Sequence, residues 1–374
     1  MGFIGNKPSA VPLTGSDLAD GIINSAKIAD GTIASVDLAA GVGGTNYSGR
    51  NDIINGGLVV NQENQTAPAD DAYTIGDLFL HVGEGTPVMS LETDGPQGTR
   101  PWQKMVLDAN AQGGLVYFMS NDDVQDYIAN GKLSFGIQLK TTAATISNAR
   151  IGILKWVGTA DAVTSDVVAS SWASDGTNPT LATSWSYENT PANIGLTTSW
   201  ARHTVEDVTV DSDTKNIAIF IWTDDGTITA SDVIGFSEWQ MNPGATVNDF
   251  SASNYQDTLL RVRYYVERHS YTDTGNEMTG YGGYQATTTI SQYDFIYNTQ
   301  KRTNATTTSS AAATFAMGYQ GLITSGTAIG YNTNGGDETE RVSLTTAAVG
   351  TAGHSVTLAR DSTDTAWLQF DSRL

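Results

Sequence analysis

Cysteine is absent from the 374 residues of this sequence. A disulfide framework, a thiolate zinc site and a cysteine nucleophile are therefore excluded. The fold has to be held by apolar burial and by hydrogen bonds between strands, or by the association of several chains.

Basic residues are also few: 19 lysines and arginines stand against 40 aspartates and glutamates, and the formal net charge is −21. Nucleic acids and anionic membrane surfaces bind clustered positive charge, so neither is an expected partner. The excess of acidic residues is compatible with the surface of a soluble particle whose copies repel one another. It is equally compatible with adaptation to a saline habitat.

Long apolar runs are missing as well. No window approaches the ~20 apolar residues of a membrane-spanning helix, and the opening MGFIGNKPSA lacks the apolar core of a secretory signal. We therefore expect no membrane insertion and no export by the general secretory route. Release by lysis, as part of a particle, fits these features.

Glycine is abundant, with 39 residues, and Thr, Ser and Ala dominate much of the rest. Such a composition is typical of short strands joined by turns. Strand-length runs occur at residues 73–82, 87–91, 102–107, 114–119, 132–140, 149–157, 201–210, 217–222 and 233–241. In the run 132–140, apolar Leu133, Phe135, Ile137 and Leu139 alternate with mostly polar residues, as in a half-buried antiparallel strand. A short helix is predicted at 121–130, with Asn121 as its N-cap. The pattern predicts an all-β fold built around a jelly-roll β-sandwich.

Three domains are expected. Residues 1–48 form an extended N-terminal arm, residues 49–270 the jelly roll, and residues 271–374 a small C-terminal β domain. Within the jelly roll, residues 52–61 predict a strand, a tight turn or bulge, and a second strand. In the C-terminal domain, residues 271–284 predict a glycine-rich connector, and strands are expected at 291–299, 303–313, 341–348 and 366–370.

The arm contains an internal repeat with a period of ten residues, over residues 17–41. Its apolar positions, which would form an oligomer core, are Leu18, Ile23, Ile28, Ile33 and Leu38. So few repeat units cannot bury their own apolar residues. The repeat therefore needs partner chains or a groove on another protein. We expect a homotrimeric stem; a flexible linker is the alternative.

Catalytic and metal-binding patterns are not recognisable. The neighbouring carboxylates, such as Asp122 with Asp123, fall in predicted turns or helix starts, where Asp serves local hydrogen bonds. No Walker A loop, nucleophile elbow or paired-histidine motif occurs. We expect no enzyme activity, no cofactor and no resident metal. The alternative is a calcium ion bound by loops at Asp211, Asp213 and Asp224 with Asp225.

Aromatic residues in the loop-rich stretch 160–198 and just beyond it suggest a ligand site. The candidates for glycan binding are Trp172, Asp175, Trp185, Tyr187 and Trp200. Aromatic faces stack on the apolar face of sugar rings, and nearby Asp, Asn or Glu side chains bind the hydroxyls. The alternative is that these rings cover an open end of the sandwich or a seam between subunits.

Several segments together resemble a known family. The opening GFIGNKPSAVPLTGSDLADGI with the repeat AKIADGTI is similar to the N-terminal arm of marine bacteriophage virion proteins. The segment NDIINGGLVVNQ, the strand GKLSFGIQL and the pair IGFSEWQMNPGATVNDF and LLRVRYY resemble a carbohydrate-binding-module-like jelly roll in phage fibre proteins. The terminal FDSRL resembles the end of a small β domain of such proteins. The chain departs from the family pattern at Arg261, where a Cys is usual, and at Met241 and Asn242.

The resemblance implies a virion structural protein, a homotrimeric tail fibre or spike. It would bind other virion proteins through residues 1–41 and contact a glycan of the host surface. A decorating protein of capsid or tail without receptor binding is one alternative, and a polysaccharide depolymerase is another. The resemblance carries over no ligand site.

Overall fold

The structure is a computed structural model that describes residues 49–108, 112–142, 146–169, 176–224, 227–271, 278–320, 322–331, 336–361 and 366–374. Gly49–Leu374 is one compact unit. Leu18, Ile23, Ile28, Ile33 and Leu38 of the predicted stem lie outside the described residues. In the described part, no helix has the length and apolar character needed to cross a membrane.

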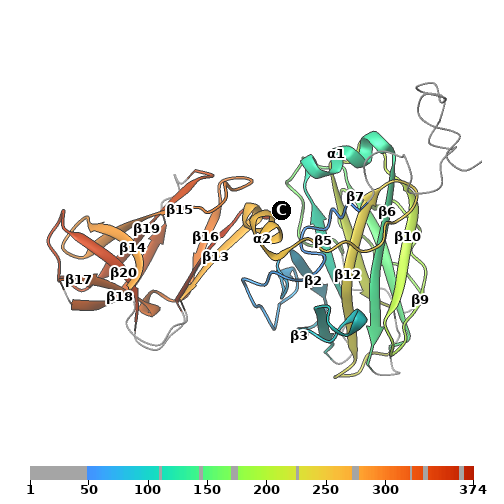
Figure 1. The fold of residues 1–374 in the computed structure, drawn as a ribbon, viewed down its shortest axis with the longest axis horizontal. Coiled ribbons are helices and arrows are strands. Elements are labelled where there is room, and N and C mark those ends of the chain that lie inside the picture. The colour runs from blue at the N-terminus through green and yellow to red at the C-terminus, as the bar shows by residue number, and fades with distance from the viewer. Residues whose placement is uncertain are drawn as a thin grey trace, which may run out of the picture. The chain divides into compact units, whose positions relative to one another are not determined.

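Two antiparallel sheets form a β-sandwich, which confirms the predicted all-β fold class (Figure 1). The first has the order β1-β2-β5-β11-β7-β8, and β9 also pairs with β7. Its strands are β1 (Ala72–Tyr73), β2 (Phe79–Gly83), β5 (Gly113–Met119), β7 (Asn148–Trp156), β8 (Trp185–Tyr187), β9 (Ile194–Gly195) and β11 (Asn216–Thr223). The second has the order β10-β6-β12-β4-β3. Its strands are β3 (Val88–Glu92), β4 (Trp102–Val106), β6 (Lys132–Thr141), β10 (Ala201–Thr209) and β12 (Val233–Pro243).

The main core lies between these two sheets. On β6 the four alternating apolar residues Leu133, Phe135, Ile137 and Leu139 are fully buried, as their spacing predicts. Strand β11 is buried along its whole length, because its inward isoleucines join the main core and its outward Phe220 and Trp222 join a second cluster. Both faces of the seven-stranded sheet are therefore covered.

The cover of the outer face comes from the stretch 160–198, which the sequence predicted as loop-rich. Val167, Val168 and Leu181 pack there together with Trp185 of β8. Val168 and Leu181 also form an isolated antiparallel bridge. The chain between β7 and β10 thus acts as a second apolar layer over the sheet.

Helix α1 (Asn121–Asn130) lies at one end of the sandwich (Figure 1). Its N-cap is Ser120, whose side chain accepts a hydrogen bond from the Asp123 backbone N–H. The predicted cap, Asn121, is instead the first helical residue. Its amide donates to the Lys215 carbonyl at 2.7 Å. The sequence prediction was therefore one residue late.

After β12 comes helix α2 (Tyr255–Tyr265), and then β13 (Val266–Tyr271) begins the C-terminal β structure. Strand β13 pairs with β21 (Ala366–Asp371), which also pairs with β16 (Thr306–Ser309). A closed barrel of order β14-β15-β19-β18-β17-β20 completes this part. Its strands are β14 (Met278–Gln285), β15 (Ile290–Ile296), β17 (Phe315–Tyr319), β18 (Leu322–Tyr331), β19 (Thr339–Thr346) and β20 (Ser355–Arg360). Short 3-10 turns occur at η4 (Pro96–Gly98) and η5 (Ala312–Thr314).

Two local predictions were wrong. Residues 52–61 hold a turn at 54–57 but no strand, because the buried Asn55 binds this backbone itself, donating to the Val60 carbonyl and accepting from its N–H. The predicted connector at 271–284 contains β14 for half its length, where Gly283 and Tyr284 pair with β15 and β20. Glycine lowers strand propensity, so the barrel partners and not the local sequence fix this strand.

Candidate functional site

The structure separates the aromatic residues that the sequence grouped together. Trp172 and Asp175 lie outside the described residues. Trp185 is only 6% exposed and packs against Trp156, with ring centroids 5.1 Å apart. Tyr187, half-buried, lies 6.3 Å from Trp222 between ring centroids and donates to the Pro179 carbonyl. Trp185 and Tyr187 therefore belong to the apolar layer over the seven-stranded sheet.

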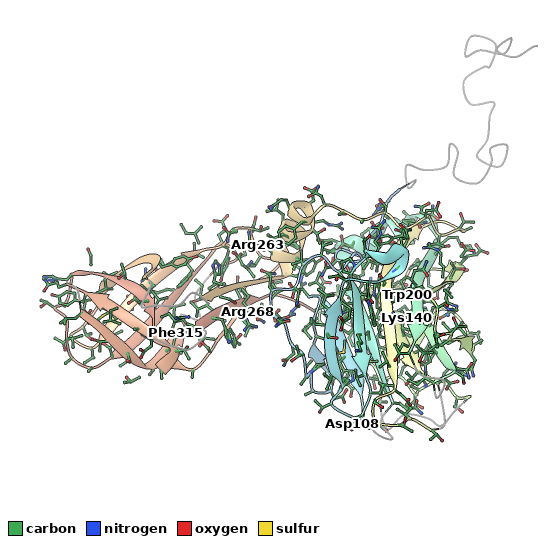
Figure 2. All side chains as sticks on the ribbon, turned by 60° about the horizontal axis from the view of Figure 1, so that its bottom comes forward. Asp108, Lys140, Trp200, Arg263, Arg268 and Phe315 are labelled. Atoms are coloured by element: carbon green, nitrogen blue, oxygen red, sulfur yellow. The ribbon has the colours of Figure 1, made fainter. Side chains whose placement is uncertain are left out.

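Trp200 lies on the other sheet. It directly precedes β10 and meets Trp102 of β4 edge-on, with ring centroids 5.4 Å apart and planes at 81°. The ammonium of Lys140, at the end of β6, lies 4.0 Å from the Trp102 ring centroid and 4.6 Å from that of Trp200. Figure 2 shows Lys140 and Trp200 side by side. We call these three side chains the indole–lysine cluster.

Strand register explains why the cluster forms. Gly235 of β12 pairs with both Lys140 and Lys104. A Cβ atom on Gly235 would lie 2.9 Å from the Trp102 ring, so the indole lies directly on the sheet at this glycine. The Trp102 indole N–H donates to Asp94 Oδ1 at 2.7 Å. That hydrogen bond holds the pKa of Asp94 below its usual range.

Exposure differs between the two indoles. Trp102 is 4% exposed, whereas Trp200 is partly exposed. The ammonium between the rings makes cation–π contacts with both, each worth about 0.5–2 kcal/mol depending on desolvation. Trp200 is thus held in one orientation while part of its surface stays available.

Polar side chains surround the cluster on the same outer face. Lys104 lies next to it on β4, Gln138 lies two residues before Lys140 on β6, and both are partly exposed. The remainder of this face is covered by the chain after β12. There Arg202 donates to the Asn248 carbonyl at 2.7 Å, and Ser134 donates to the Gly244 carbonyl at 2.8 Å. Around the cluster, Lys104, Gln138 and Trp200 stay partly exposed.

The aspartates considered for calcium are engaged with cations of the chain itself. Lys155 Nζ lies 3.2 Å from Asp213 Oδ1 and also contacts Asp211. Asp224 is 1% exposed and accepts a 2.9 Å hydrogen bond from Arg150 Nε. Asp225 lies outside the described residues.

Trp102 and Lys140 were missed as site residues by sequence reasoning. Both stand at the ends of correctly predicted strand runs, and Lys140 falls on the predicted polar face of its strand. The sequence does show on which side of its strand each residue lies. Outward-facing residues of β4 and β6 come together there because Gly235 of β12 lies between the two strands. Without the order of strands in the sheet, that meeting could not be foreseen.

No protein-family model matches the chain, and no curated protein matches it either. Solved structures similar to it are carbohydrate-binding modules. TmCBM61 in complex with β-1,4-galactotriose is 12% identical, with 52% of this chain and 99% of that chain covered and a TM-score of 0.30. The family 11 module from Clostridium thermocellum, in complex with a mixed-linked tetrasaccharide, is 12% identical and covers 48% of this chain and 96% of its own, with a TM-score of 0.28. The CBM22-1 xylan-binding domain from Paenibacillus barcinonensis is 9% identical and covers 56% of this chain and 100% of its own, with a TM-score of 0.29. With TM-scores this low, the ligands of those proteins carry no argument here, and the site is judged by its own side chains.

Proposed function

We propose that this protein binds glycans through the open outer face of the five-stranded sheet, at the indole–lysine cluster. The observation that carries the proposal is the placement of Trp200, a partly exposed indole held by Trp102 and Lys140. An indole face stacks on the C–H face of a pyranose ring, and adjacent ammonium and amide groups bind its hydroxyls. Lys104 and Gln138 supply such groups on the same face.

We propose a binding role without catalysis. Hydrolysis of a glycosidic bond needs two carboxyl groups placed on either side of the bond. The polar groups that border the indoles are Lys140, Lys104, Gln138 and Glu92, which is the register partner of Trp102 on β3. The nearby Asp94 accepts the Trp102 indole N–H. Glu92 and Asp94 both come from the end of β3, on one side of the indoles, so they suit the orientation of a sugar better than attack from two sides of a glycosidic bond.

The biological setting is also part of the proposal, and its support is the resemblance of several segments to phage fibre proteins. We propose a homotrimeric tail fibre or spike, located in the virion, assembled in the host cytoplasm and released by lysis. Residues 1–41 would bind another virion protein, and the sandwich would contact a host-surface glycan. The proposed role involves neither a cofactor nor a nucleic acid.

Glycan binding is tested by screening the full chain on a glycan array and then measuring affinity for the best ligand. Trp200→Ala should weaken binding at least tenfold, because it removes the stacking surface. Tyr255→Ala is the matched control, since Tyr255 is an aromatic residue that is 51% exposed on α2, away from the cluster. Equal affinities for Trp200→Ala and the parent would refute the site.

The virion setting is tested separately. Native mass measurement should give three chains, and deletion of residues 1–41 should leave folded protein that no longer decorates particles. A decorating protein without receptor binding would keep host adsorption unchanged in Trp200→Ala. A depolymerase would release reducing ends from host polysaccharide, and such release would contradict the proposed non-catalytic role.

A further inference from the structure

Two lysines on the outer face of the five-stranded sheet have no carboxylate partner, although the chain is strongly acidic. Acidic residues outnumber basic ones by 40 to 19, and Lys132, Lys155 and Lys301 each form an ion pair. Lys104 and Lys140 form neither an ion pair nor a hydrogen bond with any described residue, and both are partly exposed. The contacts of Lys140 are the two indole rings of the indole–lysine cluster. Both ammonium groups can therefore bind an anion from outside the chain.

The register of the sheet brings these two lysines together. Lys140 of β6 and Lys104 of β4 both pair with Gly235 of β12, so they stand on either side of a position that has no side chain. Neighbouring strands lie about 4.8 Å apart, which puts the two lysine Cα atoms roughly 10 Å from each other. A lysine side chain is long and flexible, so both ammonium groups can reach one acidic group placed between them.

The carboxylates of this face lie toward one side of it. Glu92 is the register partner of Trp102, which precedes Lys104 by two residues on β4. Asp94 accepts the Trp102 indole N–H. This hydrogen bond is the main reason for the lowered pKa of Asp94, and the charges of Lys140 and Lys104 add to it. The face thus offers a pair of cations and, next to them, carboxylates that accept hydrogen bonds.

A sugar ring that carries a single carboxylate matches this distribution of charge. In a uronic acid, the carboxylate is attached to one side of the ring and the hydroxyl groups occupy the others. Hydrogen bonds between an ammonium and a carboxylate are stronger than those between neutral groups. The hydroxyl groups can donate to carboxylates such as Glu92, whereas a densely sulfated sugar would bring negative charge close to them.

The acidity of the whole chain does not oppose such a ligand. The net charge of −21 acts at long range, and exposed charges more than about 8 Å apart are largely screened at physiological ionic strength. A nucleic acid or an anionic membrane presents a dense array of charges and needs a broad basic surface. One carboxylate on a sugar needs only the local pair formed by Lys104 and Lys140.

We propose that the glycan bound at the indole–lysine cluster is acidic and contains uronic acid units. This inference rests on the proposed glycan-binding function and names the substrate class of the same site. The carboxylate of a uronic acid accepts hydrogen bonds from Lys104 and Lys140. Its ring lies against the partly exposed indole of Trp200, and its hydroxyl groups reach Gln138 and Glu92.

The test uses pairs of oligosaccharides that differ only in the carboxylate. The full chain is titrated with oligosaccharides of polygalacturonate, alginate and hyaluronan, and with carboxyl-reduced forms in which each carboxylate has become a primary alcohol. An acidic oligosaccharide should bind roughly tenfold more tightly than its reduced form, because reduction removes the ion pair. Added salt should weaken binding of the acidic form more than binding of the reduced form.

Lys104→Met should weaken binding of the acidic form roughly tenfold and leave binding of the reduced form unchanged. Lys104 suits this test because the cation–π contacts that hold the indoles come from Lys140. Lys104→Arg keeps the charge and should retain most of the affinity. Lys215→Met is the matched control, since Lys215 is an exposed lysine next to β11 of the other sheet, and this variant should bind as the parent does.

Trp200→Ala distinguishes failure of this inference from failure of the proposed function. Equal affinity of the parent for acidic and reduced forms, with both lost in Trp200→Ala, would overturn the acidic class and keep the glycan site. Binding of the acidic form that is lost in Lys104→Met but unchanged in Trp200→Ala would overturn the proposed stacking site. Equal effects of Lys104→Met on acidic and reduced forms would also overturn the inference, and binding of no glycan would overturn both proposals.

Discussion

The guanidinium of Arg373 stacks on the ring of Tyr73, with its central carbon 3.5 Å from the ring centroid. Arg373 follows the last strand of the C-terminal β structure, whereas Tyr73 belongs to β1 of the sandwich. The same guanidinium donates to Glu63 Oε1 at 3.0 Å and to Asp371 Oδ1 at 3.0 Å, and its side chain is 5% exposed. A single arginine thus joins the two β structures.

We expect Arg373→Ala to lower the free energy of unfolding by about 3–5 kcal/mol, because Glu63 would keep a largely buried charge without its partner. Arg373→Lys should restore only part of this loss, since an ammonium can neither stack as a plane nor bind both carboxylates in the same geometry. Urea unfolding followed by tryptophan fluorescence measures both. The control is Arg341→Ala, whose exposed pair with Asp294 should contribute at most ~1 kcal/mol. An equal loss in both alanine variants would contradict the expectation.

The buried pair of Glu267 and Lys301 predicts a pH dependence. The two side chains are 1% and 0% exposed, and Lys301 Nζ donates to Glu267 Oε2 at 2.7 Å. Burial by itself would raise the pKa of Glu267, but His269, Lys301 and Asn298 overcome this and lower it to about 2. The ordinary pKa of a glutamate in an unfolded chain is about 4.3. The folded-state pKa is therefore the lower one, so this carboxylate stabilises the fold fully above that unfolded value and loses its contribution as pH falls toward about 2.

We expect Glu267→Gln to cost about 3–5 kcal/mol at neutral pH, because Lys301 would be left buried without its anion. The difference between parent and variant should shrink as pH falls from 5 to 2, which unfolding experiments across that range would measure. The double variant Glu267→Gln with Lys301→Met should recover part of the neutral-pH loss. A difference that stays constant with pH would show that the carboxylate does not contribute in this way.

Strands of the sandwich were predicted correctly where the pattern of apolar residues within a single strand is enough to identify it. Strand β6 alternates over its length, and the apolar run of β11 needs burial on both faces, so their placement follows from period and composition. The barrel was harder, since β14 has the glycines of a connector and gains its strand form from β15 and β20. Local propensity cannot report partners that are distant in the sequence.

The candidate site was predictable only in part, for a related reason. Trp185 and Trp200 have similar loop-like surroundings in the sequence, yet one is buried beside Trp156 and the other stands beside Trp102. The difference arises because Trp185 lies on β8, which pairs with β7 of the seven-stranded sheet, whereas Trp200 leads into β10 of the other sheet. Aromatic residue type alone does not tell which sheet a ring will face.

Lys155 pairs with two of the aspartates that the sequence offered as calcium ligands. Among the described residues, no group of acidic side chains and histidines is arranged to hold a metal ion. Its ammonium contacts Asp211, Asp213 and Glu188, and the first two are 51% and 64% exposed. Lys155→Met would leave three carboxylates facing each other, and carboxylate oxygens are the ligands that calcium prefers. We expect this variant to lose about 1–3 kcal/mol of stability and to regain part of it when calcium is added.

Thermal unfolding with and without calcium checks this expectation. The melting temperature of Lys155→Met should rise with calcium, whereas that of the parent and of Lys155→Arg, which keeps the positive charge, should not. A calcium-induced rise in the parent of the same size would instead indicate a cation site elsewhere in the chain.

The close approach of Gly235 and Trp102 gives a way to disturb the indole–lysine cluster without touching its members. A methyl group at position 235 would lie 2.9 Å from ring atoms Cε3 and Cζ3 of Trp102, so Gly235→Ala has to displace the indole. We expect a loss of about 1–3 kcal/mol from overpacking and, at temperatures where the variant stays folded, at least tenfold weaker glycan binding. The control is Gly282→Ala on β14, where an added Cβ meets no atom within 4 Å. Unfolding curves and glycan titrations of both variants separate the two effects, and wild-type glycan affinity in a folded Gly235→Ala would show that Trp102 does not position the binding surface.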